Sequence, residues 1–294
     1  MGEVVIMWLI CAFGSAFFAG ITAILSKIGV EDVNSNLATA IRTAVVFVVS
    51  WLLVLALGVQ AQIPQIGVKT MVFLILSGLA TGASWLCYFR ALARGDVNKI
   101  APIDKSSTIL TMIAAFIFLG EPISPLKLVC IVLIAAGTYL MIEKKAAADT
   151  AEERGWLIWA VLSAIFAAMT SIFAKIGISD IDSNLGTAIR TGVVLVMAWG
   201  IVFAEGRQRE IRKISRKSLF FLVISALATG ASWLCYFRAL KDGAASIVVP
   251  IDKLSILVTI LFSRIILREK LTAHAAAGLL LLVGGTLLLL YPGC

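Results

Sequence analysis

Charged side chains are scarce in this sequence. Asp, Glu, Lys and Arg together make up 14% of its 294 residues, whereas hydrophobic residues make up 61%. In a soluble domain, about a quarter of the residues are charged. The composition therefore excludes a soluble globular protein and predicts an integral membrane protein.

Catalytic and metal-binding patterns are also missing. The sequence has one histidine and five cysteines, and the cysteines show neither metal-ligand spacing nor a disulfide framework. It contains no HExxH, GxSxG or paired-acid motif that would supply a nucleophile, a base or a metal site. We therefore expect no enzyme activity, no bound metal and no cofactor.

Apolar segments are abundant, and each has about the 20 residues that a helix needs to span a bilayer. The first has no basic stretch before it and no suitable cleavage site after it, so we expect it to remain as a helix and not to act as a cleaved signal peptide. Ten such segments occur, at 5–28, 37–57, 70–92, 100–119, 125–142, 156–176, 185–204, 218–240, 245–267 and 271–291.

The second half of the sequence repeats the first at a constant offset of 148 residues. The phrase LATGASWLCYFRAL is identical at 79–92 and 227–240. Likewise KIGVEDVNSNLATAIRT, at 27–43, returns as KIGISDIDSNLGTAIRT at 175–191. The chain is therefore predicted to be a duplicated five-helix unit.

The predicted fold is an all-α integral membrane protein with ten transmembrane helices. The first five-helix repeat covers 1–146 and the second covers 155–294. Because five is odd, the second repeat must enter the bilayer from the opposite side. This predicts an inverted repeat with a pseudo-two-fold axis in the membrane plane.

Lys and Arg are distributed unevenly among the connections between helices. The connections that follow odd-numbered helices carry thirteen of them, and the other connections carry three. Since basic loops stay in the cytoplasm, the odd-to-even connections are predicted to be cytoplasmic and both termini to face outward. The net charge of +8 is then explained by topology, and no nucleic-acid partner is needed.

Polar and aromatic side chains form a stripe on the third helix of each repeat, at the spacing i, i+3, i+4, i+7 of one helical face. A cavity lining is one interpretation, and helix packing through small polar residues is the alternative. A weaker stripe in helix 1 leaves both open. The predicted substrate-binding residues are Thr81, Ser84, Trp85 and Tyr88, their copies Thr229, Ser232, Trp233 and Tyr236, and Ser107 and Ser255 in helices 4 and 9.

Charged side chains inside the spans cost ~2.5–3.5 kcal/mol each at a helix centre, so they persist where they are paired or face water. We expect Asp104 and Asp252 to be proton-coupling or gating carboxylates. For lysines and arginines at helix ends, such as Lys175 and Arg238, snorkelling to the headgroups is the alternative. The predicted gating or coupling residues are Arg42, Asp104 and Lys105 in the cytoplasmic leaflet and their copies Arg190, Asp252 and Lys253 in the outer leaflet.

Several phrases resemble the drug/metabolite transporter superfamily, specifically its EamA-type members. They are GASWLCYFRAL in the third helix of each half, PIDKSS and PIDKLS in the fourth, and LGEPIS at 119–124. The resemblance implies a bundle around a central cavity, alternating access and transport of small organic solutes, often outward. Ten-helix members usually keep both termini in the cytoplasm. Either the halves here are in swapped order, or the charge count does not report the orientation.

The function expected from these features is that of a secondary transporter in the cell membrane, with the lipid bilayer and a small-molecule substrate as its partners. The charged residues predicted for each leaflet include more positive than negative side chains, which favours an amino-acid-like zwitterion or an organic anion as substrate. A lipid flippase or a channel on the same fold and a multidrug exporter are the alternatives. A proton or another ion is expected to be coupled, and both a monomer and a homodimer are compatible with the sequence.

We predict that the loop at 207–217 lies in the cytoplasm and that Cys294 lies outside, because six basic residues hold that loop inside. Labelling of single cysteines with a membrane-impermeant reagent in intact cells measures both positions, as do C-terminal reporter fusions. A cytoplasmic C-terminus would overturn the orientation and the leaflet assignments together.

Overall fold

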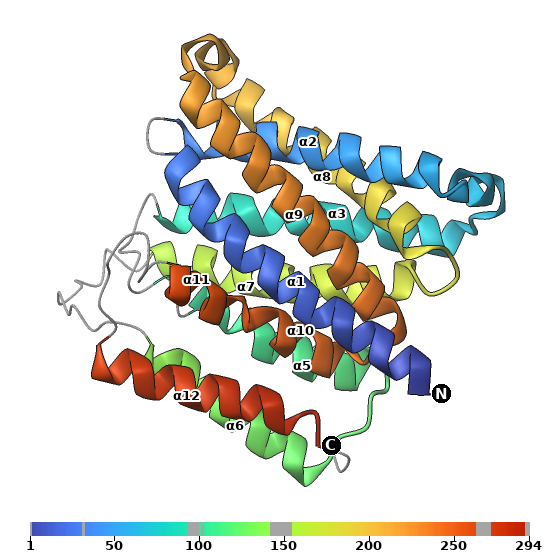
Figure 1. The fold of residues 1–294 in the computed structure, drawn as a ribbon, viewed down its shortest axis with the longest axis vertical. Coiled ribbons are helices and arrows are strands. Elements are labelled where there is room, and N and C mark those ends of the chain that lie inside the picture. Colours follow the sequence, from blue (N-terminus) through green and yellow to red (C-terminus); the bar gives the residue numbers. More distant parts are fainter. Residues whose placement is uncertain are drawn as a thin grey trace.

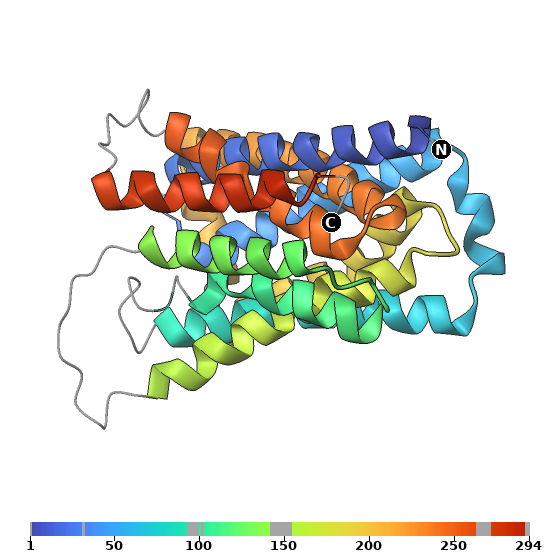
Figure 2. The same cartoon turned by 90° about the horizontal axis from the view of Figure 1, so that it is seen from below.

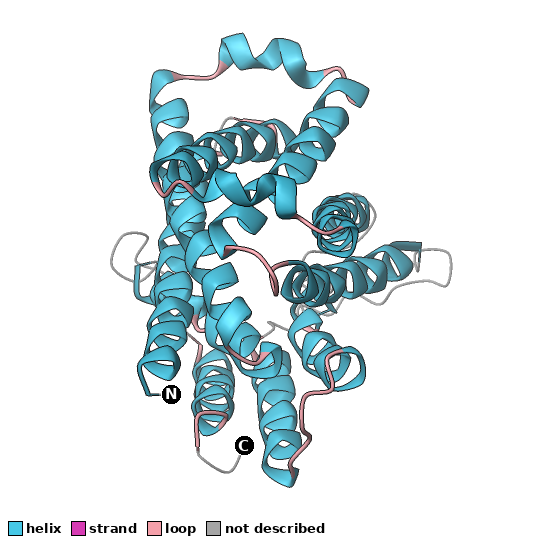
Figure 3. Cartoon of the chain, turned by 90° about the vertical axis from the view of Figure 1, so that its right-hand side faces the viewer, coloured by secondary structure: helices cyan, strands magenta, loops and turns pink. Residues whose placement is uncertain are grey.

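The computed structural model describes residues 2–30, 33–92, 100, 103–141, 155–262 and 272–291, and no strand occurs in them (Figure 3). The predicted boundary between the repeats, at 147–154, lies outside the described residues, as does Cys294. The helices of the first repeat are α1 (Gly2–Gly29), α2 (Ser35–Ala56), η1 (Val59–Gln65), α3 (Val68–Leu92), α5 (Ser107–Phe118) and α6 (Pro125–Leu140). Those of the second are α7 (Gly155–Gly177), α8 (Ser183–Ala204), η3 (Arg207–Lys213), α9 (Arg216–Asp242), α10 (Ala245–Lys253), α11 (Ser255–Phe262) and α12 (Ala273–Leu288).

Seven helical segments among the described residues are long and apolar enough to cross a membrane, with α10 and α11 counted as one. The shorter apolar helices α6 and α12, together with the α5 segment, complete the set of ten. Large apolar side chains such as Leu52, Val132 and Val196 are exposed on the outside of the bundle, where lipid would surround them. The prediction of an all-α membrane fold with ten helices is confirmed.

The fourth and ninth helices are broken, although the sequence predicted them as unbroken spans. The breaks fall at Ser106 and Leu254, which are 148 residues apart. The amide of Ser106 bonds the carbonyl of Ile103 at 3.1 Å, and that of Leu254 bonds Ile251 at 3.0 Å, so each turn closes on the third residue back. Irregular backbone at membrane depth is tolerated only where it is buried in protein or lines a cavity.

The two repeats interlock, because the closest helix pairs join one repeat to the other. Helix α1 packs along α9, and α3 packs along α7 (Figure 1). Since α7 is the copy of α1 and α9 the copy of α3, these two inter-repeat seams are the same contact formed twice. Helices α2 and α8 pair with each other, as do α6 and α12.

The connections also follow the repeat. Gly58 and Gly206 precede η1 and η3 and have φ angles of 69° and 68°, in the left-handed region that favours glycine. In Figure 1, η1 lies at the end of the bundle that holds the N-terminus, and the basic η3 lies at the opposite end. Figure 2 shows the helices running side by side between these two ends. The two loops that the charge count assigned to opposite sides are therefore at opposite ends.

Candidate solute-binding site

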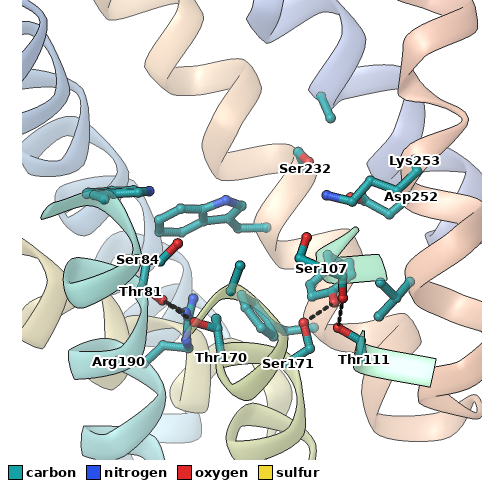
Figure 4. Close-up of a pocket in the computed structure, with 17 residues that line it drawn as sticks. Thr81, Ser84, Ser107, Thr111, Thr170, Ser171, Arg190, Ser232, Asp252 and Lys253 are labelled. Atoms are coloured by element: carbon teal, nitrogen blue, oxygen red, sulfur yellow. Dashed lines mark hydrogen bonds between the residues drawn. The ribbon is translucent and has the colours of Figure 1, made fainter. Parts of the chain in front are cut away.

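A central cavity of about 300 Å³ lies between the two repeats. Its walls come from α1, α3, α7, α8, α9 and α10 and from the start of α5, so both inter-repeat seams contribute (Figure 4). The residues that line it are Ala19, Thr81, Ser84, Trp85, Ser107, Thr111, Ala167, Thr170, Ser171, Arg190, Ser232, Trp233, Tyr236, Phe237, Val249, Asp252 and Lys253.

Arg190 is the most deeply buried charge on the cavity wall, with 1% of its surface exposed. Its Nη2 donates to Thr81 Oγ1 at 2.8 Å and its Nε donates to Ser77 Oγ at 3.2 Å. The guanidinium carbon lies 4.2 Å from the centroid of the Phe237 ring and 5.4 Å from that of Trp233. These neutral groups orient the guanidinium, and the two rings interact with its charge.

The charge of Arg190 has no carboxylate partner within ion-pair distance among the residues that the structure describes. Its Nη1 is buried and makes no hydrogen bond there. A buried charge without a counter-ion costs several kcal/mol unless a ligand supplies the opposite charge. The buried guanidinium therefore keeps one unused donor beside the cavity.

Asp252 and Lys253 face Arg190 across the cavity, just before the break in helix 9 (Figure 4). Ser15 Oγ donates to Asp252 Oδ1 at 2.5 Å, and the copy of this bond joins Ser163 Oγ to Asp104 Oδ1 at 3.2 Å. Neither carboxylate forms an ion pair in the described chain, so a serine hydroxyl is the side-chain partner of each. The central cavity thus carries two cations and one anion.

Paired hydroxyls cross both seams at the helical spacing that the sequence displayed. Ser15 contacts Ser232 at 3.3 Å, and the copy is Ser163 with Ser84, also at 3.3 Å. Of these four, the two serines of the third helices also line the cavity. Both interpretations of the stripe therefore apply there, whereas Ser15, in the weaker helix 1 stripe, is fully buried in packing.

Lys105 and Lys253 both line a second cavity of about 340 Å³, together with Asp104. The two lysines therefore meet in one cavity and do not lie at two separate ends of a pathway, while the leaflet of each stays a prediction. Lys253 lies near the middle of the span Ala245–Phe262, not near its end. Copies that lie close to a two-fold axis also lie close to each other, and this is why the two lysines meet.

Three of the predicted binding residues do not line the central cavity. Thr229 lies with Arg42 in a small cavity of about 50 Å³, where Arg42 Nη2 donates to Thr229 Oγ1 at 2.6 Å. Ser255 lines the second cavity, and Tyr88 packs with Trp156 and other apolar residues at the opposite end of the bundle from the N-terminus. The other seven of the ten predicted binding residues line the central cavity, and their role in binding stays a prediction.

The sequence analysis missed Ser171 and Phe237, which line the central cavity. Ser171 Oγ and the Tyr236 hydroxyl are 2.8 Å apart. A signal existed, because Ser171 departs from its copy Ala23 in an otherwise similar helix. Phe237 lies four residues after Trp233 of the stripe, so helical spacing would also have placed it beside that face.

Among the lysines and arginines at helix ends, some point into the protein and others point outward, as snorkelling to the headgroups would require. Lys175 Nζ donates to the carbonyls of Lys241 at 3.0 Å and Gly243 at 2.7 Å, so it points into the protein and not to the headgroups. Arg238 is exposed and pairs with Asp242 at 3.1 Å. Snorkelling thus fits Arg238 and fails for Lys175.

Comparisons with known proteins agree with this architecture. The model of the EamA-like transporter family matches residues 6–143 and again residues 154–291. A Sinorhizobium protein described as an uncharacterized transporter in the cobO 3′ region is 46% identical over 136 residues, which are 46% of this chain and 96% of the relative. An uncharacterized transporter of Archaeoglobus fulgidus is 22% identical over 265 residues, 90% of this chain and 91% of the relative. A solved crystal structure at 16% identity covers 97% of this chain and 96% of its own, with a TM-score of 0.76, which shows a shared fold alone.

We predict that Thr81→Val destabilises the protein more than Thr229→Val. Both substitutions remove the hydroxyl that accepts from an arginine, but Arg190 is fully buried whereas Arg42 is half-buried. A charged group that loses its acceptor without access to water costs about 1–3 kcal/mol. The melting temperatures of the two purified variants measure the difference, and equal values would contradict this account of Arg190.

Proposed function

Because the chain belongs to the EamA-like transporter family, we propose that it is a secondary transporter of a small organic metabolite that carries a carboxylate. The proposed cycle is alternating access across the plasma membrane, in the direction of export. The proposed substrate class rests on Arg190, which lines the central cavity and whose Nη1 makes no hydrogen bond to the described residues. A carboxylate there would supply the missing charge and form a charge-assisted hydrogen bond.

An amino-acid-like zwitterion fits the charges of the central cavity best. Its carboxylate would bind Arg190, and its ammonium would bind Asp252 on the facing wall. The indoles of Trp85 and Trp233 offer an apolar surface for the rest of the molecule. A volume of about 300 Å³ limits the solute to a small metabolite.

Alternating access is supported by the difference between the two ends of the bundle. Arg190 is fully buried at one end, whereas its copy Arg42 is half-buried at the other. Helix α7 packs against α9, whereas the copies α1 and α3 make no comparable contact among the described residues. Two nearly identical repeats in different arrangements correspond to one of two states that the halves would exchange.

We predict that Arg190→Gln weakens binding of the solute by about 10- to 150-fold, the effect of losing one charged hydrogen bond. A thermal-shift screen of carboxylates and zwitterions, each beside its neutral amide, finds the solute, because a ligand of the folded state raises the melting temperature. The exposed Arg238→Gln is the matched control and should keep the full shift. Arg190→Lys tests whether the charge alone suffices.

The same solute should then show saturable counterflow in proteoliposomes, which a carrier supports and a channel does not. A solute whose amide binds as well as its acid, or a full thermal shift in Arg190→Gln, would overturn the assignment of the carboxylate to Arg190. Binding without counterflow would contradict the transport cycle itself.

We predict that Asp104→Asn and Asp252→Asn reduce the pH dependence of transport, because an amide cannot carry the proton that these carboxylates are proposed to couple. Each carboxylate accepts from a serine across a seam, next to a helix break that would move during the cycle. Asp182→Asn is the matched control, because Asp182 caps α8 and its copy Asn34 caps α2 in the same way. Unchanged pH profiles in both variants would make the two acids structural partners of the nearby cations.

A further inference from the structure

The end of the bundle that holds the C-termini of α7 and α9 is held by hydrogen bonds between these two helices and the connections next to them, and we call it the closed end. There Ser171 Oγ lies 2.8 Å from the Tyr236 hydroxyl, which joins α7 to α9 next to the central cavity. Lys241 Nζ donates to the carbonyl of Ile181 at 2.6 Å and so ties the end of α9 to the connection between α7 and α8. These bonds depend on side chains that the repeat does not share.

A third donor holds the closed end through the connection between α5 and α6. Glu121 accepts from the backbone amides of Ala245 at 2.6 Å and Ser246 at 3.0 Å, and so links the first repeat to the start of α10. Lys127 is 2% exposed, and its Nζ donates to the carbonyl of Pro122 at 2.9 Å, next to Glu121. Lys127 therefore positions the connection that carries the carboxylate.

Alanine occupies the copy of each of these three donors. Ala23 stands where Ser171 stands in the second repeat, and Ala275 stands where Lys127 stands in the first. The copy of Lys241 is Ala93, which lies outside the described residues but has no side-chain donor in any conformation. Closure of the opposite end can use copied groups such as Arg42, but it cannot form these three bonds.

We propose that these three unshared donors bias the empty transporter towards the state observed here, in which this end is held closed. The proposal rests on the alternating access proposed above. A bond present in only one of two states shifts their populations by its free energy. For a hydrogen bond that factor is about two- to tenfold, so three together set a clear resting state.

The resting state fits the proposed export of a metabolite. With the predicted topology, the closed end faces outward, so the empty carrier presents its central cavity to the cytoplasm. A carrier that rests in this state can bind the intracellular solute without a preceding conformational change. The bias governs which side the empty protein presents, and the gradients still govern net flux.

The test compares both ends in a variant without native cysteines. Ala245→Cys, at a fully buried position, reports opening of the closed end through its rate of maleimide labelling. Ser171→Ala should raise that rate by about two- to tenfold, Tyr236→Phe should raise it equally, and the double variant should add nothing further. Ser179→Ala is the control, because the Ser179 hydroxyl bonds the carbonyl of Ile176 three residues back in the same turn, and its loss should leave the rate unchanged.

The reciprocal substitution tests the same idea without removing any group. Ala23→Ser gives the opposite end a hydroxyl to match Tyr88, so it should also raise labelling at Ala245→Cys, and Tyr88→Phe should reverse that gain. Thr39→Cys, beside Arg42 at the opposite end, should become slower to label in the same variants. Unchanged labelling in Ser171→Ala, or slower labelling in Ala23→Ser at Ala245→Cys, would overturn the proposed bias.

The solute separates the failure of this inference from that of the proposed function. If the solute changes labelling at the two ends in opposite directions while the serine variants do nothing, alternating access stands and the bias is wrong. If neither the solute nor any variant changes labelling at either end, both are wrong.

Discussion

The packing of α1 along α9 and of α3 along α7 is the constraint on which the rest of the structure depends. In lipid, helices gain little from burying apolar side chains, so they associate through close contact and hydrogen bonds between small polar groups. The serines and threonines of the two seams provide both. Because every seam joins the repeats, neither half has a complete cavity wall of its own. The site therefore exists only where the two copies meet.

The same fourteen residues at 79–92 and 227–240 occupy two different surroundings. Tyr236 hydrogen-bonds Ser171 at the central cavity, whereas Tyr88 packs in an apolar cluster with Trp156. At the ends of the two phrases, Arg238 pairs with Asp242, whereas Arg90 lies 4.8 Å from the ring centroid of Trp159. Identical sequence thus gives different contacts, because the two copies pack against different neighbours at opposite ends of the bundle.

Much of the fold could be predicted from the sequence, because segment length and the offset of 148 residues are one-dimensional quantities. Helical periodicity also predicted that Thr81, Ser84 and Trp85 share one face of their helix, and that face lines the central cavity. The sequence could not show which helix that face meets. The convergence of Lys105 and Lys253 on one cavity depends on their distance from the pseudo-two-fold axis, which no spacing encodes. The breaks at Ser106 and Leu254 could not be predicted either, because they are changes in local backbone hydrogen bonding inside apolar spans of ordinary length.

The joining of the two repeats in one chain has a consequence for how such a protein changes over time. The Sinorhizobium relative matches 46% of this chain over 96% of its own length, so it is about as long as one repeat. In an assembly of two identical short chains, any substitution occurs in both copies and alters both ends together. In a fused chain, a substitution can change one half and leave the other unchanged. The hydroxyl that Ser171 carries and its copy Ala23 lacks is a difference that only unequal halves can inherit.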